Sequence, residues 1–205
     1  MYVLMINGSP KPKGCIGTAL KIIGEELRNE GIETETVAVG NKDIRGCIAC
    51  LRCKQTGKCV FDDPVNEVAP KFERADGIVL GTPVYFGSAN GGMVSFADRL
   101  FYSTPFDKTM KVGASVISNR RGGSSATFDE MNKYFTISGM PVVSSSYWND
   151  VHGYTEEDVY KDEEGVQTMK NLARNMAFLL KGISLAKEAY GLPKMVREVH
   201  TNMIR

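Results

Sequence analysis

Four cysteines lie close together in the run GCIACLRCKQTGKC, with the spacing Cys-x2-Cys-x2-Cys-x5-Cys. They are Cys47, Cys50, Cys53 and Cys59, and the fifth cysteine, Cys15, stands apart from them. Thiolates at this spacing can all turn toward one centre, as in the compact ferredoxin run. The four thiols therefore indicate redox or metal chemistry.

Three interpretations of these four thiols are open. In the first, they ligate a [4Fe–4S] cluster, although Val60 follows the last cysteine where the ferredoxin run has proline. In the second, they bind a zinc ion, which usually takes two Cys-x2-Cys pairs set further apart. In the third, they are metal-free thiols in a loop that packs near a bound cofactor or a partner subunit.

The composition is that of an ordinary globular protein and points to no charged polymer as partner. The chain has 205 residues, 42% hydrophobic and 24% charged, with a formal net charge of +1. We therefore expect no nucleic-acid partner, and no membrane partner because no apolar run approaches the roughly 20 residues that span a bilayer. The first residues lack the basic flank and cleavage site of a signal peptide, so we expect a cytoplasmic, reducing location.

Strand-like apolar runs alternate with amphipathic helical patterns along the chain. This order predicts an α/β fold with a doubly wound five-stranded parallel sheet, strand order 2-1-3-4-5, and helices on both faces. Such a sheet binds its ligand beyond the carboxyl ends of the strands. The expected strands are 2–7, 33–39, 77–85, 111–119 and 141–148, and the expected helices are 18–31, 65–76, 93–102, 124–138 and 162–190.

The cysteines fall in an expected loop of about residues 41–63, after the second strand. We predict that Pro70 interrupts or kinks the helix that follows this loop, because proline lacks the N–H of a helical hydrogen bond. One domain is expected over residues 1–190, followed by a C-terminal tail or oligomer arm over residues 191–205.

The segment NGSPKPKGCIGTAL (7–20) leads from the first strand into a helix and supplies hydroxyls, lysines and glycines. A loop of this kind binds phosphate through backbone N–H groups and the positive end of the helix dipole. It carries neither the Walker sequence nor the G-x-G-x-x-G fingerprint, which favours a mononucleotide. The alternative is an ordinary Gly/Pro-rich turn.

Two further strand ends have unusual composition. GTPVYFGSANGGMVSFADRL (81–100) passes from a buried strand through two aromatic residues to glycines, which permit the close approach of a flat cofactor. Alternatively, the two aromatic residues belong to the core and the glycines only form a turn. SNRRGGSSAT (118–127) carries Arg120 and Arg121, which either stabilise negative charge near a cofactor or are solvated surface cations.

Together, NGSP with the following GTAL, GTPVYFGSANGGMVSFADR and SNRRGG resemble the NADPH-dependent FMN reductase group of the flavodoxin-like superfamily. The cysteine run also resembles that of the iron–sulfur flavoproteins in this group. The resemblance covers roughly residues 1–150. It implies FMN as cofactor, NAD(P)H as co-substrate, a small-molecule electron acceptor, and a homodimer or homotetramer.

The resemblance also implies which residues contact FMN. The phosphate loop departs from the commoner G-N-T ending by having GCIGT, which leaves the individual roles of Cys15 and Ile16 open. The implied contacts are Ser9, Lys11, Cys15, Ile16, Gly17 and Thr18 for the phosphate, Pro83, Val84, Tyr85, Phe86 and Gly87 for the ring and ribityl chain, and Ser118, Arg120, Arg121 and Gly122 along the ring.

The leading functional hypothesis is an FMN-dependent NAD(P)H oxidoreductase that reduces flavin, quinone or another small electron acceptor. The alternative is an iron–sulfur flavoprotein electron carrier that relays electrons between FMN, a [4Fe–4S] cluster and protein partners. A non-redox nucleotide or metal-binding module is a third hypothesis, which three flavin-loop motifs in order weigh against. No catalytic acid, base or nucleophile is predicted, and Trp148 and His152 are expected at most to flank the pocket.

Overall fold

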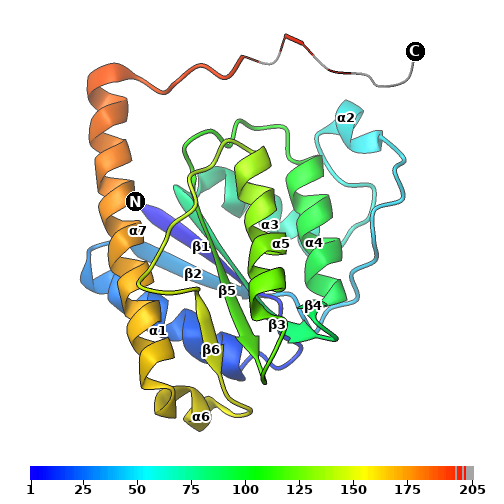
Figure 1. The fold of residues 1–205 in the computed structure, drawn as a ribbon. Coiled ribbons are helices and arrows are strands. Elements are labelled where there is room, and N and C mark those ends of the chain that lie inside the picture. The colour runs from blue at the N-terminus through cyan, green and yellow to red at the C-terminus, as the bar shows by residue number, and fades with distance from the viewer. Residues whose placement is uncertain (197, 200, 202–205) are drawn as a thin grey trace.

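The computed structural model describes residues 1–196, 198, 199 and 201 of the chain. Its centre is a sheet of parallel strands in the order β2-β1-β3-β5-β6, drawn in Figure 1. A sixth strand, β4, lies off this path and pairs antiparallel with β3. The strands are β1 (Tyr2–Asn7), β2 (Glu33–Ala38), β3 (Gly77–Tyr85), β4 (Ser88–Ala89), β5 (Val112–Asn119) and β6 (Asp150–His152).

The helices form a layer on each face of this sheet (Figure 1). One layer holds α1 (Cys15–Asn29), α6 (Glu156–Lys161) and α7 (Glu163–Tyr190), which pack against one another. The other holds α2 (Arg52–Thr56), α3 (Pro64–Arg74), α4 (Gly91–Ser103) and α5 (Ser124–Ile137). The predicted α/β fold with a parallel sheet is confirmed, but the sheet has six strands in the order 2-1-3-5-6 and not five.

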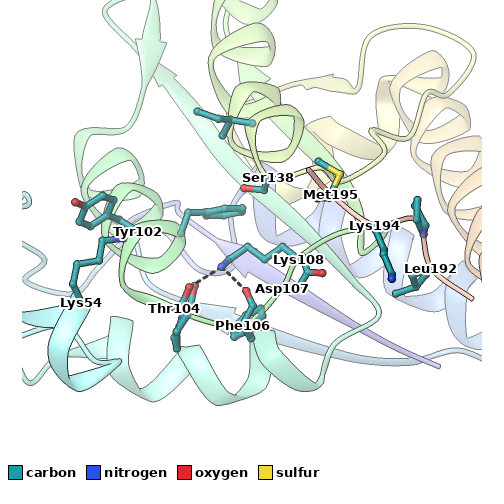
Figure 2. Close-up of a pocket in the computed structure, with 14 residues that line it drawn as sticks. Lys54, Tyr102, Thr104, Phe106, Asp107, Lys108, Ser138, Leu192, Lys194 and Met195 are labelled. Atoms are coloured by element: carbon teal, nitrogen blue, oxygen red, sulfur yellow. Dashed lines mark hydrogen bonds between the residues drawn. The ribbon is translucent and has the colours of Figure 1, made fainter. Parts of the chain in front are cut away.

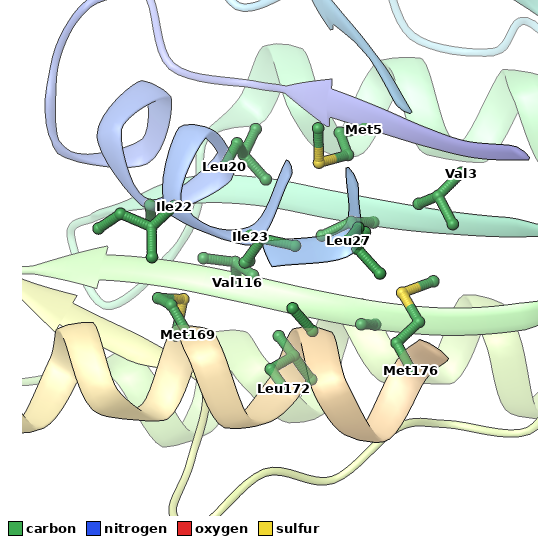
Figure 3. Close-up of a cluster of buried hydrophobic side chains, with 14 of the residues drawn as sticks. Val3, Met5, Leu20, Ile22, Ile23, Leu27, Val116, Met169, Leu172 and Met176 are labelled. Carbon is green, nitrogen blue, oxygen red and sulfur yellow. The ribbon is translucent and has the colours of Figure 1, made fainter. Parts of the chain in front are cut away.

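Each layer buries its own apolar cluster against the sheet. Figure 3 shows the cluster beneath α1 and α7, which includes Leu20 and Ile23 of α1 and Leu172 and Met176 of α7. All four of these side chains are fully buried. The spacing of the apolar residues along both helices places them on one face, which is why each helix lies flat against the sheet.

The fifth strand is the prediction that the structure corrects. Residues 141–148 do not form it, and only Val142 makes an isolated bridge, to Gly113. The serines of this segment are held instead by α7: Asn175 Nδ2 donates to the Ser144 carbonyl at 2.8 Å and Asn171 Nδ2 donates to Ser146 Oγ at 3.0 Å. The chain therefore pairs with β5 only afterwards, through β6.

Pro70 and the residues after α7 are the next two places where the sequence made a prediction. Pro70 does not interrupt α3, which runs from Pro64 to Arg74 with Pro70 on its exposed side. Water can therefore satisfy the carbonyl that loses its helical partner. The predicted tail begins after α7, and Met195 lies against Gly139, whereas residues 197, 200 and 202–205 lie outside the described part. No helix in the described part is long and apolar enough to cross a bilayer.

The packing of β5 against α5 gives a direct test of the fold. A Cβ atom on Gly113 would lie 2.4 Å from the ring of the buried Phe135, whereas one on Gly182 of α7 would meet nothing within 4 Å. We expect Gly113→Ala to lower the free energy of unfolding by about 1–3 kcal/mol through overpacking. Gly182→Ala is expected to raise it by about 0.5–1 kcal/mol, because alanine is the better helix former. Urea unfolding followed by circular dichroism measures both, and a Gly113→Ala protein as stable as wild type would contradict this packing.

Candidate functional site

Three loops carry the predicted flavin contacts, and all three leave the carboxyl edge of the sheet. We name them the phosphate loop (residues 8–14, after β1), the hairpin loop (residues 86–90, after β3) and the β5 loop (residues 119–123). Parallel pairing places Asn7 beside Gly81 and Pro83 beside Ser118, so the three strands end together. A Cβ atom on Gly123 would lie 2.8 Å from the Cα of Gly87, so the second and third loops touch.

Asn7 organises the phosphate loop, although the sequence analysis did not single it out. Its Oδ1 accepts a hydrogen bond from the Ser9 N–H at 2.9 Å, and its Nδ2 donates to the Pro12 carbonyl at 3.1 Å. The loop then closes on α1 so tightly that a Cβ atom on Gly17 would lie 2.0 Å from the Pro12 oxygen. Only glycine fits at that position.

The beginning of α1 leaves its first N–H groups open to an anion. Its N-cap, Gly14, makes no side-chain cap, and the first turn holds no acidic residue. The predicted phosphate residues differ in what they offer there. Ile16 is buried in the core and Thr18 Oγ1 already donates to the Gly14 carbonyl at 3.2 Å, so these two face the loop mainly with backbone. Ser9 is buried, whereas Lys11 is exposed at the loop mouth.

Cys15 contributes to the contact between the phosphate loop and the loop after β6. Its Sγ donates to the Thr155 carbonyl at 3.5 Å, and the Lys11 ammonium lies 4.8 Å from the centre of the Tyr154 ring. Burial raises the pKa of the Cys15 thiol above its ordinary value. Cys15 is therefore held as a thiol with a structural contact, which agrees with its separation from the other four cysteines.

The hairpin loop is a tight turn that projects two aromatic side chains. Phe86 and Gly87 have φ values of 52° and 91°, which is the left-handed geometry of a two-residue hairpin turn. The alternative that Tyr85 and Phe86 are core aromatics is wrong, because Tyr85 is half exposed and Phe86 is completely exposed. The turn is anchored by Glu130, which accepts hydrogen bonds from the Ser88 hydroxyl at 2.7 Å and the Ala89 N–H at 3.2 Å.

The β5 loop contains an unpaired buried amide. Neither Oδ1 nor Nδ2 of Asn119 has a hydrogen-bond partner within the described protein, although the side chain is only 5% exposed. Buried amides are almost always paired, so a water molecule or a ligand would satisfy this one. It lies between the predicted contacts Ser118, which is buried, and Arg120, which is exposed. The polar edge of a flavin ring fits this unmet need, and the sequence analysis did not identify Asn119.

The flanking residues Trp148 and His152 lie beyond the β5 loop. They share a cavity of about 210 Å³ with Ser124 and the first turn of α7. His152 contacts Asp162 twice. Its backbone N–H donates to Asp162 Oδ2 at 2.7 Å, and its ring Nδ1 lies 3.4 Å from the same oxygen. We assign it no catalytic role.

The four clustered cysteines all line one small cavity. We call residues 41–63 the cysteine segment, and its cavity is also lined by Ile48, Leu51 and Val60, each about half exposed. Ala49 and Leu51 have φ values of 52° and 57°, and these turns bring successive cysteines to the same side. Cys59 Sγ accepts two N–H bonds from Arg99 of α4, at 3.1 and 3.2 Å.

The four thiols are spread around a space of only about 20 Å³ in this structure. Among the described residues, no three His, Cys, Asp or Glu side chains come close enough together to hold one metal ion. The four thiolates of a [4Fe–4S] cluster bind four different iron atoms and therefore lie further apart than the ligands of one zinc ion.

Helix α4 connects the two sites. At its first turn, the Met93 side chain packs beneath the phosphate loop, where a Cβ atom on Gly8 would lie 2.8 Å from it. Its N-cap Asn90 accepts hydrogen bonds from the N–H groups of Gly92 and Met93. Arg99, at the cysteine cavity, lies roughly 9 Å further along the axis, since each helical residue rises about 1.5 Å.

A separate cavity of about 850 Å³ lies at the amino edge of the sheet, where α4 and α5 end (Figure 2). There Lys108 Nζ donates to the carbonyls of Thr104 and Phe106, at 2.8 and 3.2 Å. Tyr102, whose ring centre lies 4.1 Å from the Lys54 ammonium, lines both this cavity and the cysteine cavity. None of the predicted flavin residues lines this cavity.

Comparison with known proteins agrees with this geometry. The model of the NADPH-dependent FMN reductase family matches residues 1–155. The chain is 34% identical to an iron–sulfur flavoprotein of Methanocaldococcus jannaschii over 192 residues, 88% of this chain and 98% of the relative. Its fold is similar to RosB with a bound riboflavin-5'-phosphate derivative (TM-score 0.71, 15% identity, 100% and 92% of the two chains) and to a flavodoxin from the domain Archaea (0.59, 14%, 88% and 99%).

The close contact at Gly17 predicts a specific loss of cofactor binding. Gly17→Ala must displace the Pro12 carbonyl and with it the phosphate loop, so we expect the dissociation constant for FMN to rise by roughly tenfold or more. Fluorescence titration of the flavin-free protein measures this constant. Gly182→Ala is the matched control, because its Cβ meets nothing, and it is expected to bind FMN as wild type does. Equal affinity of the Gly17→Ala protein would show that phosphate does not bind at this loop.

Proposed function

This chain belongs to the NADPH-dependent FMN reductase family of flavin-dependent oxidoreductases, and we propose that its FMN exchanges electrons with a [4Fe–4S] cluster in the cysteine segment. One observation carries the proposal: all four clustered cysteines line the same small cavity, beside the helix that also supports the phosphate loop. The likeness to an iron–sulfur flavoprotein across 88% of this chain supports it.

The residues at the carboxyl edge would hold FMN by complementary means. Open N–H groups at the start of α1 and the phosphate loop would bind the phosphate, while Gly87 and Gly122 would let the ring approach the backbone. The Asn119 amide would pair with a polar edge of the ring. The exposed guanidinium groups of Arg120 and Arg121 would favour the negative charge of the reduced cofactor. When bound, FMN supplies both hydride and single-electron chemistry.

The cysteine segment would hold the cluster through its four thiolates. Cys53 and Cys59 are partly buried and Cys47 and Cys50 exposed, so two ligands would be fixed by the protein and two would close the site from the solvent side. The apolar side chains beside the thiols would reduce the contact of the cluster with water, and solvent exposure is one of the factors that sets the reduction potential of such clusters. When bound, the cluster supplies one-electron chemistry, which FMN can also exchange.

A second candidate is the NAD(P)H-driven reduction of a quinone, a flavin or another small acceptor at FMN alone. The family description and the open carboxyl edge support it, because exposed Tyr85 and Phe86 leave room for a second planar molecule. In both candidates no side chain transfers a proton or forms a covalent bond. The protein would accelerate the reaction by binding and orienting the two reactants.

We further propose that the protein works as a homo-oligomer. Helix α7 extends beyond the sheet and presents large apolar side chains to solvent, with Phe178 77%, Leu185 68% and Tyr190 90% exposed. Exposed apolar residues of this size along one helix are typical of a surface that another subunit covers. A homodimer or homotetramer would bury them.

Substitution of one exposed cysteine tests the cluster. Protein purified anaerobically is expected to contain about four irons per chain together with FMN. Cys50→Ser is expected to lose most of the iron and keep its FMN, because Cys50 is remote from the phosphate loop. Cys15→Ser is the matched control and should keep its iron. The proposal fails if wild type and Cys50→Ser contain equal iron, or if Cys50→Ser loses FMN and iron together, which would make the segment purely structural.

The two candidate functions differ in how they depend on the cysteines. With NADPH as donor, we expect Cys50→Ser to slow the reduction of cytochrome c, a large one-electron acceptor, by roughly tenfold or more. Reduction of a benzoquinone by the same protein should stay close to wild type, because a small two-electron acceptor can react at the flavin. Steady-state absorbance assays measure both rates. Equal losses with the two acceptors, or no loss with either, would contradict a relay through the cluster.

A further inference from the structure

Arg99 is a charged residue in a place that charges normally avoid. It lies on α4 and is only 1% exposed, although its guanidinium carries five N–H donors and a permanent positive charge. A buried charge is stable only if it is paired and its donors find acceptors. The sequence analysis assigned Arg99 no role, and it contacts none of the predicted flavin residues.

One side of the guanidinium binds a carboxylate. Nη1 donates to Asp63 Oδ2 at 2.6 Å and Nη2 donates to Asp63 Oδ1 at 3.0 Å, which is the two-pronged geometry of a strong arginine–carboxylate pair. Nη1 also donates to the Arg45 carbonyl at 3.1 Å. Both partners belong to the cysteine segment, so this side of Arg99 fixes the two ends of that segment to α4.

The other side of the guanidinium faces a sulfur. Nε and Nη2 donate to Cys59 Sγ at 3.2 and 3.1 Å, and the Phe61 ring lies 4.9 Å from Cζ and covers the group. Asp63 alone would have satisfied the charge. Among the described residues, however, the Nε donor reaches only the sulfur of a cysteine that also lines the thiol cavity.

We propose that Arg99 is a positioning residue for the cluster: it fixes the Cys59 sulfur at the cavity and raises the reduction potential of the cluster bound there. This inference rests on the proposed function. Hydrogen bonds to a ligand sulfur withdraw electron density and favour the reduced, more negative state of the cluster. Asp63 offsets part of the arginine charge and therefore limits this effect.

A purely structural ion pair would behave differently from a pair that tunes the sulfur. If Arg99 and Asp63 only tie the segment to α4, then weakening either partner loosens the same contact, and both changes act in the same direction. If the guanidinium acts on the Cys59 sulfur, then losing its N–H···S bonds and losing its counter-ion have opposite effects. The sign of the change in potential therefore separates the two roles.

The experiment is a reductive titration of the cluster, followed by electron paramagnetic resonance, in wild type and two variants. Arg99→Lys keeps a positive charge beside Asp63, but the single ammonium cannot reproduce the planar fork that serves the carboxylate and the sulfur together. We expect its cluster potential to shift to a more negative value. Iron content and FMN content should stay close to wild type, because the four ligands and the phosphate loop are untouched.

Asp63→Asn is the matched variant. Asparagine keeps the N-cap of α3, where Asp63 Oδ1 accepts the Val65 N–H at 3.1 Å, and keeps an amide oxygen beside the guanidinium, so the segment should stay attached to α4 at some cost in stability. It removes the counter-charge and leaves Arg99 on the sulfur, and we expect its potential to shift to a more positive value. Shifts of the same sign in the two variants, or no shift in Arg99→Lys, would overturn the proposal.

A wild-type protein without iron would count against the proposed function but would still leave Arg99 testable. In that metal-free protein, alkylation by iodoacetamide is followed for each cysteine by mass spectrometry. Arg99 both covers the Cys59 sulfur and stabilises its thiolate, so we expect Arg99→Lys to change the rate at Cys59 by roughly tenfold and to leave the rate at the exposed Cys47 close to wild type. Equal rates for Cys59 in wild type and Arg99→Lys would overturn the positioning role.

Discussion

A buried positive charge on α4 determines how the cysteine segment is held. The guanidinium of Arg99 has almost no contact with solvent, so the fold must supply it with a carboxylate, a carbonyl and a sulfur. The pKa of Arg99 reflects this balance: burial alone would lower it, but the hydrogen bonds to Asp63 and Cys59 outweigh burial and raise it. Removing one partner of such a pair typically costs about 3–5 kcal/mol. A segment with little regular structure of its own is thereby fixed to a core helix.

Helix α4 contacts both the cysteine segment and the phosphate loop at the carboxyl edge of the sheet. The chain reaches α4 directly from β3 through the two-residue hairpin turn, and Met93 in the first turn of α4 packs under the phosphate loop. The cofactor loops and the thiol cavity thus lie at two levels of one helix.

The sequence predicts much of this fold because buried strands and helices have short, regular patterns of apolar residues. The bounds of β1 and β3 agree with the predicted 2–7 and 77–85, since both are unbroken apolar runs between turn residues. The prediction of a fifth strand at residues 141–148 was wrong. Asn171 and Asn175, which lie far along the chain, bind serines of this segment. Strand β4 was missed because a two-residue strand has no periodicity to detect.

The candidate site divides in the same way. Glycines and hydroxyls after each strand identify the three loops, because a close approach to backbone requires small residues. The sequence did not predict roles for Asn7, Asn119 and Arg99, because each role depends on tertiary contacts. Asn7 bridges the phosphate loop, and Asn119 is buried without a partner among the described residues. Arg99 contacts Asp63 and Cys59 only in the folded chain. The burial of a polar group depends on tertiary contacts that spacing does not reveal.

The measurement that tests the central claim most directly is an anaerobic reductive titration of the intact protein, counting the electrons taken up per chain. FMN accepts two electrons and a [4Fe–4S] cluster accepts one, so the account predicts about three electrons per chain. The flavin absorbance and the cluster signal should both respond within the same titration. Uptake of two electrons, with the flavin as the only responding centre in anaerobically purified protein, would contradict it.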